Sequence, residues 1–292
     1  MPLANVKIVP GINKADTPSG AEGQWIDGDF VRFRYGQPEK IGGYTAIGQE
    51  TISGPTRAQH TWTDLEGNRY AALGTSKALY IYYEDKFYDI TPLATAITGA
   101  TFTSTNGSNT VTVNKTSHAL DVGEYVTFTS VTLPGGGATG FTVANFQDFT
   151  YEVLTAPNAN SFTIQMKTNE SGTGMTAAGS ASINPYEEIG PTIQTYGYGW
   201  GTGTWSRGTW GSGTTSSTVI LDPGTWSLDN FGQQLIATVK DGKTFVWNPG
   251  LSNPLEQRAV VMTGAPTASR LTITSDRDRH VVHFGTETTI GD

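Results

Sequence analysis

The sequence predicts an all-β protein built from small antiparallel sheets, with a second β domain inserted among them. Three observations support this prediction. Glycine and proline contribute 36 and 14 of the 292 residues, and only 15% of the residues are charged; this composition suits short strands and tight turns rather than helical bundles or doubly wound α/β folds. Short apolar runs alternate with turn residues along most of the chain. One strand pattern recurs at a spacing typical of propeller blades.

The N-terminal segment contains one clear strand signal. From Phe30 to Phe33, apolar and charged residues alternate around Val31, which predicts a strand with Arg32 and Arg34 on one face. The sequence Gly-Gln-Pro at 36–38 then predicts a turn.

The first sheet is expected within residues 57–93. Strand-like runs here are separated by turn signals at 64–68, 75–77 and 84–86. Three or four strands in so short a segment form one antiparallel meander, which is the size of a propeller blade. We therefore assign residues 1–96 to an N-terminal segment and a first blade.

Residues 97–184 differ in composition and are rich in Thr, Val, Phe and Asn. Asn, Gly and Pro turns separate four expected strands, at 110–113, 125–128, 150–154 and 161–165. A segment of this size fits an immunoglobulin-sized β-sandwich or a small barrel. We predict an inserted immunoglobulin-like β-sandwich.

Residues 185–225 form a Gly- and Trp-rich linker. Trp200, Trp205 and Trp210 are spaced five apart, which matches neither a helix nor a strand. The loop is either a flexible aromatic linker or a contact surface. Since exposed tryptophans are costly for a monomer and anchor many interfaces, we predict that these three side chains contact another subunit or a partner protein.

Residues 226–292 predict further propeller blades. Two strand starts, Gln234 and Arg279, lie 45 positions apart, which is a blade period. Without the insertion, the chain has residues for four blades at most, and closed propellers have four to eight. The array is therefore expected to be incomplete, so that either a longer chain or other subunits complete it.

The net charge of −8 and the absence of cysteine limit the chemistry of the chain. No basic stripe indicates tight nucleic-acid binding, and no thiolate can act as a nucleophile or metal ligand. His280 and His283 should lie on opposite faces of a strand, which disfavours a shared metal. We predict no catalytic, cofactor-binding or metal-binding residues.

The nearest approach to a basic cluster is Arg32, Arg34 and Lys40. These residues are candidates for weak, nonspecific contact with DNA, or they form an ordinary solvated strand face. No apolar run is long enough to span a membrane. The first residues lack the features of a signal peptide, so synthesis in a cytoplasm is expected.

Several segments resemble the N-terminal portion of tail nozzle or tail hub proteins of short-tailed bacteriophages. They lie within residues 24–93 and 196–286 and include Gln24–Phe33, Asp89–Pro92, Trp226–Gly232, Arg279–Gly285 and the Tyr/Gly/Trp loop. The resemblance implies a structural virion protein, made in the host cytoplasm, that forms a ring of usually six subunits. The ring would dock on the portal adaptor, contact tail fibres or other tail proteins, continue the DNA channel, and retain and then conduct the genome.

Two other functions fit an all-β tail protein. The first is a receptor- or carbohydrate-binding propeller, which specific glycan binding would reveal. The second is a propeller-type hydrolase. Because no catalytic constellation is present in the sequence, we expect a protein that is not an enzyme.

Overall fold

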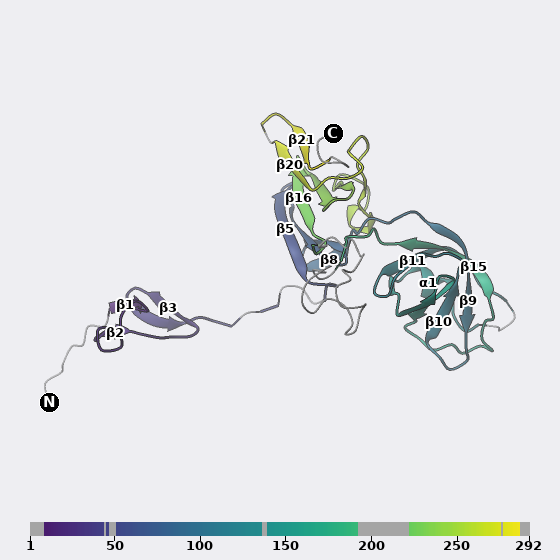
Figure 1. Ribbon diagram of the computed structural model, residues 1–292, viewed down its shortest axis with the longest axis horizontal. Coiled ribbons are helices and arrows are strands. Elements are labelled where there is room, and N and C mark those ends of the chain that lie inside the picture. Colours follow the sequence, from purple (N-terminus) through teal and green to yellow (C-terminus); the bar gives the residue numbers. More distant parts are fainter. Residues whose placement is uncertain are drawn as a thin grey trace, which may run out of the picture. The chain divides into compact units, whose positions relative to one another are not determined.

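The computed structural model (Figure 1) describes residues 9–43, 45–46, 51–135, 139–191, 222–275 and 277–286. The chain divides into two compact units, Met1–Gln49 and Glu50–Asp292. Within the described residues there are 21 strands, one five-residue α-helix and one 3-10 turn. The predicted all-β fold class is confirmed.

The N-terminal unit consists of two small sheets. Strand β1 (Val9–Ile12) pairs in parallel with β2 (Gln24–Trp25), and β3 (Val31–Arg34) forms a hairpin with β4 (Gln37–Lys40). The hairpin turns at Tyr35 and Gly36, whose φ angles of 51° and 77° fit a tight two-residue loop. The turn therefore comes one residue earlier than predicted, and Pro38 lies within an edge strand.

The larger unit begins with a four-stranded antiparallel sheet, called blade 1. Its strands follow one another as a meander: β5 (Thr56–Thr63), β6 (Arg69–Thr75), β7 (Leu79–Tyr83) and β8 (Lys86–Asp89). Alternate residues such as Tyr70, Ala72 and Ile81 are buried, because one face of the sheet packs against a second sheet. The meander predicted from residues 57–93 is present.

The inserted segment forms one seven-stranded sheet, called the inserted sheet. In spatial order its strands are β12 (Tyr151–Glu152), β11 (Tyr125–Thr132), β15 (Ala178–Pro185), β9 (Ile97–Ser104), β10 (Thr110–Asn114), β14 (Ser161–Gln165) and β13 (Thr155–Asn158). The sheet curls on itself: the Val153 N–H donates to Glu124 O, and the next N–H, of Leu154, donates to Thr163 O. Of the two architectures that fit the segment, the small barrel is the nearer description.

The core of the inserted sheet is aromatic. The rings of Phe102, Phe128, Phe146 and Phe162 are fully or almost fully buried, and the Phe102 and Phe146 rings lie 4.4 Å apart. Phe146 comes from the short helix α1 (Val143–Gln147), which a capping box between Thr142 and Asn145 begins. The inserted sheet thus buries a core of its own.

A second blade and a hairpin follow the inserted sheet. Blade 2 contains β16 (Trp226–Phe231), β17 (Gln234–Val239), β18 (Thr244–Trp247) and β19 (Val260–Val261), with a 3-10 turn, η1 (Pro254–Glu256), before its last strand. The C-terminal hairpin contains β20 (Leu271–Ser275) and β21 (His280–Phe284). Strands β16 and β20 start 45 residues apart (271 − 226), in agreement with the predicted blade spacing.

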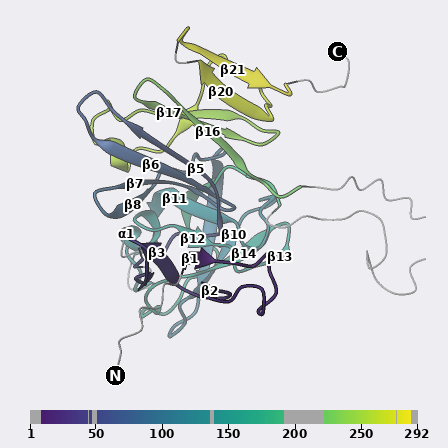
Figure 2. The same cartoon turned by 90° about the vertical axis from the view of Figure 1, so that its left-hand side faces the viewer.

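Blade 1, blade 2 and the C-terminal hairpin stack in this order, as Figure 2 shows from its middle to its top. Both neighbouring pairs are in contact, β5 with β16 and β16 with β20. These three are the first strands of their sheets. The stack therefore places equivalent strands side by side, as propeller blades do.

Candidate functional site

The chain leaves blade 1 and returns from the inserted sheet through a paired stem. Ala94 N–H donates to Pro185 O, Glu187 N–H donates to Pro92 O, and Leu93 bridges to Tyr186. The two segments run antiparallel, so the chain enters and leaves the inserted sheet at one place. This stem positions Tyr186 beside blade 1.

Three side chains from distant parts of the sequence meet at the stem. Asp89 ends β8, Tyr186 follows β15, and Arg258 precedes β19. The guanidinium of Arg258 lies 3.3 Å from Asp89 Oδ1, donates to the Tyr186 hydroxyl at 3.2 Å and donates to Thr91 O at 2.9 Å. The Tyr186 hydroxyl donates to the other Asp89 oxygen. This junction joins blade 1, the inserted sheet and blade 2.

The environment of the junction favours a neutral Tyr186 phenol and a charged Arg258 guanidinium. Burial raises the pKa of the Tyr186 phenol, and the neighbouring Asp89 carboxylate raises it further. Burial works against the charge of Arg258, but Asp89 and Tyr186 together more than offset this effect, so the pKa of Arg258 lies above its usual range. Arg258 also lies 4.8 Å from the centre of the Tyr186 ring. All polar groups of the junction have partners, and its role is to fix the three sheets to one another.

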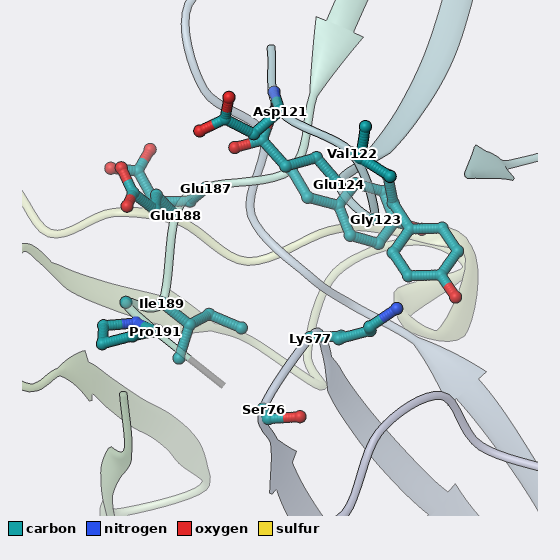
Figure 3. A pocket seen from close by; sticks show the side chains of 13 residues that line it. Ser76, Lys77, Asp121, Val122, Gly123, Glu124, Glu187, Glu188, Ile189 and Pro191 are labelled. Carbon is teal, nitrogen blue, oxygen red and sulfur yellow. Dashed lines mark hydrogen bonds between the residues drawn. The ribbon is translucent and has the colours of Figure 1, made fainter. Parts of the chain in front are cut away.

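A cavity of about 360 Å³ opens beside this junction (Figure 3). Its walls come from the turn after β6, from the loop before β11 and from the returning stem. The lining residues are Ser76, Lys77, Asp121–Tyr125 and Tyr186–Pro191. The cavity lies between blade 1 and the inserted sheet.

The cavity is predominantly acidic. Asp121, Glu124, Glu187 and Glu188 contribute four carboxyl groups, against one lysine, Lys77. Burial raises the pKa of Glu124, and the nearby carboxylates of Asp121 and Glu188 raise it further. A cationic side chain would be attracted into this cavity, and a phosphate group would be repelled.

Two of the cavity's charged groups are already paired. The Lys77 ammonium lies 2.9 Å from Glu152 Oε1 and 5.2 Å from the Tyr125 ring centre. Lys243 Nζ lies 2.7 Å from Glu187 Oε1. Among the described residues, no group of three or more His, Asp or Glu side chains is arranged to hold a metal ion.

The predicted interface residues Trp200, Trp205 and Trp210 lie outside the described residues. The linker leaves the described chain at Pro191 and rejoins it at Asp222, and Gly224 N–H donates to Pro191 O. Pro191, the last described residue before this segment, lines the cavity.

The candidate DNA-contact residues lie on the β3–β4 hairpin, but they do not share one face. Arg32 and Arg34 are both exposed, two residues apart on the same face. Lys40 is paired in register with Val31 and therefore lies on the other face. Arg32 lies 3.1 Å from Glu39, which neutralises part of its charge. Contact with DNA stays a prediction.

Sequence reasoning missed Asp89, Tyr186 and Arg258. They are separated by 97 and 72 positions along the chain, and each lies at the end of an ordinary strand or turn. An Arg-Tyr-Asp group of this kind has no fixed spacing. Only the topology brings these residues together.

The histidines are placed as expected. His280 is exposed and His283 is half-buried on the other face of β21, where its Nδ1 lies 3.0 Å from Thr272 Oγ1. No helix in the described ranges is both long and apolar enough to cross a membrane.

No protein-family model and no curated protein matches the chain. Among solved structures, a similar chain is the "Phage phi92 endosialidase", with 12% sequence identity and a TM-score of 0.25. The match covers 82% of this chain and 35% of that one. A likeness at this level carries no argument about fold or function.

Proposed function

We propose that the protein is a non-enzymatic structural subunit of a short phage tail, of the nozzle or hub type. The observation that carries the proposal is the stack of three blade-like sheets, whose strands contain the segments that resemble this family. Asp89, at the end of blade 1, and Trp226, at the start of blade 2, both belong to those segments, and both hold the stack together.

In this proposal the subunits form a ring, most simply a hexamer, within the virion tail. The ring docks on a portal adaptor and contacts tail fibres or other tail proteins, with Trp200, Trp205 and Trp210 as contact residues. It continues the DNA channel, retains the packaged genome and conducts it during ejection. Contact with the passing DNA is transient and nonspecific, with Arg32, Arg34 and Lys40 as the candidate residues.

Three features support a conduit rather than a DNA-binding protein. The net charge is −8, and the acidic cavity beside the stem would repel phosphates. Arg32 is neutralised in part by Glu39. A surface of this kind lets DNA slide, because it lacks the cationic site that would hold the backbone.

The proposal is tested by negative-stain imaging of the purified protein together with a DNA-binding titration. Closed rings with a central opening, and no submicromolar binding of double-stranded DNA at physiological salt, are the expected results. Single particles of one chain at every concentration, or tight DNA binding, would contradict it. Selective binding on a glycan array by single chains would instead support the receptor-binding alternative.

A further inference from the structure

The three stacked sheets meet through faces of alternating chemistry. Blade 1 and blade 2 contact each other through apolar and aromatic side chains, among them Trp62, Tyr70 and Trp247. Blade 2 and the C-terminal hairpin meet through hydroxyl groups, among them those of Thr238 and Thr272. At each contact, the two faces match in polarity.

The C-terminal hairpin has a second face, which is apolar and has no partner among the described residues. Leu271 is paired in register with Phe284, and Ile273 with Val282, so the four side chains form one continuous patch. The exposed fractions are 47% for Leu271, 45% for Phe284, 44% for Ile273 and 38% for Val282. Alternate residues of the same strands, Thr272 and His283, point the other way, toward blade 2.

The other end of the stack carries a row of mostly apolar side chains, on the part of the blade 1 face that Ser53 and Tyr186 leave open. On blade 1, Thr61, Ala71, Tyr82 and Phe87 form one row across the four strands by register. Ala71, Tyr82 and Phe87 are only half-buried, and Thr61 is exposed. A hollow of about 360 Å³ on this face is lined by apolar and aromatic groups together with two threonines and one arginine: Thr61, Trp62, Thr63, Arg69, Tyr70, Ala71 and Tyr82. An apolar side chain such as Ile273 or Phe284 fits a hollow of this size.

We propose that the outer face of the C-terminal hairpin binds the outer face of blade 1 in a second copy of this chain. The contact continues the stack from one copy to the next and repeats the apolar chemistry of the blade 1–blade 2 contact. The two faces belong to the first and the last sheet of the stack (Figure 2), so one copy cannot pair them with each other. The contact is heterologous, and it forms a ring when the rotation between copies is a whole fraction of a full turn.

This inference rests on the proposed ring and names the surfaces that would build it. Since the chain has no cysteine, engineered cysteine pairs report the contact cleanly. The test variant carries Ile273→Cys and Tyr82→Cys, one on each face. The matched control carries Ile273→Cys and Asn106→Cys, the latter in an exposed turn of the inserted segment.

After mild oxidation at micromolar protein, the test variant should form a ladder of disulfide-linked chains on a non-reducing gel. Each single-cysteine variant can form dimers at most, and the control pair should form no ladder. Wild-type rings without a ladder in the test variant would overturn the inference and leave the proposed function standing. A wild-type protein that stays a single chain throughout would overturn both.

Discussion

The two interfaces within the stack join neighbouring β-sheets through different kinds of side chain. Between blade 1 and blade 2, the Trp247 ring lies 5.5 Å from the Tyr70 ring and 6.2 Å from the Trp62 ring, both edge to face. Between blade 2 and the C-terminal hairpin, Thr238 Oγ1 lies 2.8 Å from Thr272 Oγ1 and 2.9 Å from Thr244 Oγ1. We call these the aromatic interface and the threonine interface.

This difference predicts how the stability of each interface responds to substitution. The aromatic interface depends on buried area and close packing, so removing volume or adding a methyl group is costly. The threonine interface depends on directional hydrogen bonds, whose net contribution is small as long as every group keeps a partner. Substitutions in the aromatic interface should therefore have the larger effects.

The largest expected effect comes from removing Trp247. This side chain is 1% exposed and contacts aromatic rings of blade 1, so Trp247→Ala should lower the free energy of unfolding by about 3–5 kcal/mol. Urea unfolding followed by circular dichroism measures it. The matched control is Trp25→Ala in the N-terminal unit, where the ring is 36% exposed and the cost should stay below about 1 kcal/mol. Equal losses in the two variants would refute the aromatic interface as the main contact.

Gly74 of β6 lies against the Trp226 side chain of blade 2, where the two blades pack most closely on a glycine. A methyl group at this position would lie 2.5 Å from Cδ1 of the Trp226 indole, closer than atoms can approach. Gly74→Ala should therefore destabilise the protein by about 1–3 kcal/mol. Gly42→Ala is the control, because nothing lies within 4 Å of a methyl group there. A Gly74→Ala protein as stable as the control would mean that the two blades are not in close contact.

The threonine interface should show a smaller, recoverable loss. Thr238→Val removes a hydroxyl that bonds to both Thr244 and Thr272, and it should cost about 1–2 kcal/mol, because the buried Thr244 hydroxyl loses this partner while Thr272 keeps His283. Adding Thr272→Val to the same chain should cost less than the sum of the single changes, since the hydrogen bond between the two hydroxyls can be lost only once. Thr155→Val, on an exposed strand, serves as the control. Strict additivity in this double-mutant cycle would show that the two hydroxyls do not interact.

The smallest expected effect is a dependence on pH through His283. Burial lowers its pKa below the ordinary value, so the folded protein binds a proton there less readily than the unfolded chain does. Its contribution to stability is therefore present above the unfolded pKa and is lost as the pH falls from about 7.5 to about 5.5. His283→Gln should flatten the fall in melting temperature over this range. The control is His280→Gln, at an exposed position, and its melting temperature should vary with pH as in the wild type. A steeper pH dependence in His283→Gln would contradict a lowered pKa at His283.

The fold could be predicted from the sequence where strands carry large alternating side chains. The runs that became β7, β10 and β14 show this pattern, because their alternate Ile, Val and Phe residues enter a core. Strands β9 and β15 were missed, since they consist largely of Thr, Ala, Ser and Gly, which have weak strand signals. They take their places in the inserted sheet by pairing with β11 and β10, which have stronger strand signals. The result is one curled sheet in place of the expected sandwich.

The candidate site could not be predicted in the same way. Lys77 and Glu187 line the cavity from opposite sides of the inserted segment, and no local pattern links them. The sequence did identify Arg32 and Arg34 as neighbours on one strand face, because a two-residue period is local. It could not place Lys40 on the other face, since this depends on the register set by the turn at Tyr35 and Gly36.

The central claim is that the apolar end of the stack continues into a second copy, and native mass spectrometry tests it most directly. At micromolar concentration the wild type should appear as a single closed multiple of the chain mass. A variant with Ile273→Asp and Phe284→Asp should bind at least about tenfold more weakly and shift to single chains, while retaining its melting temperature. A wild type found only as single chains, or a variant that still forms the full assembly, would contradict the claim.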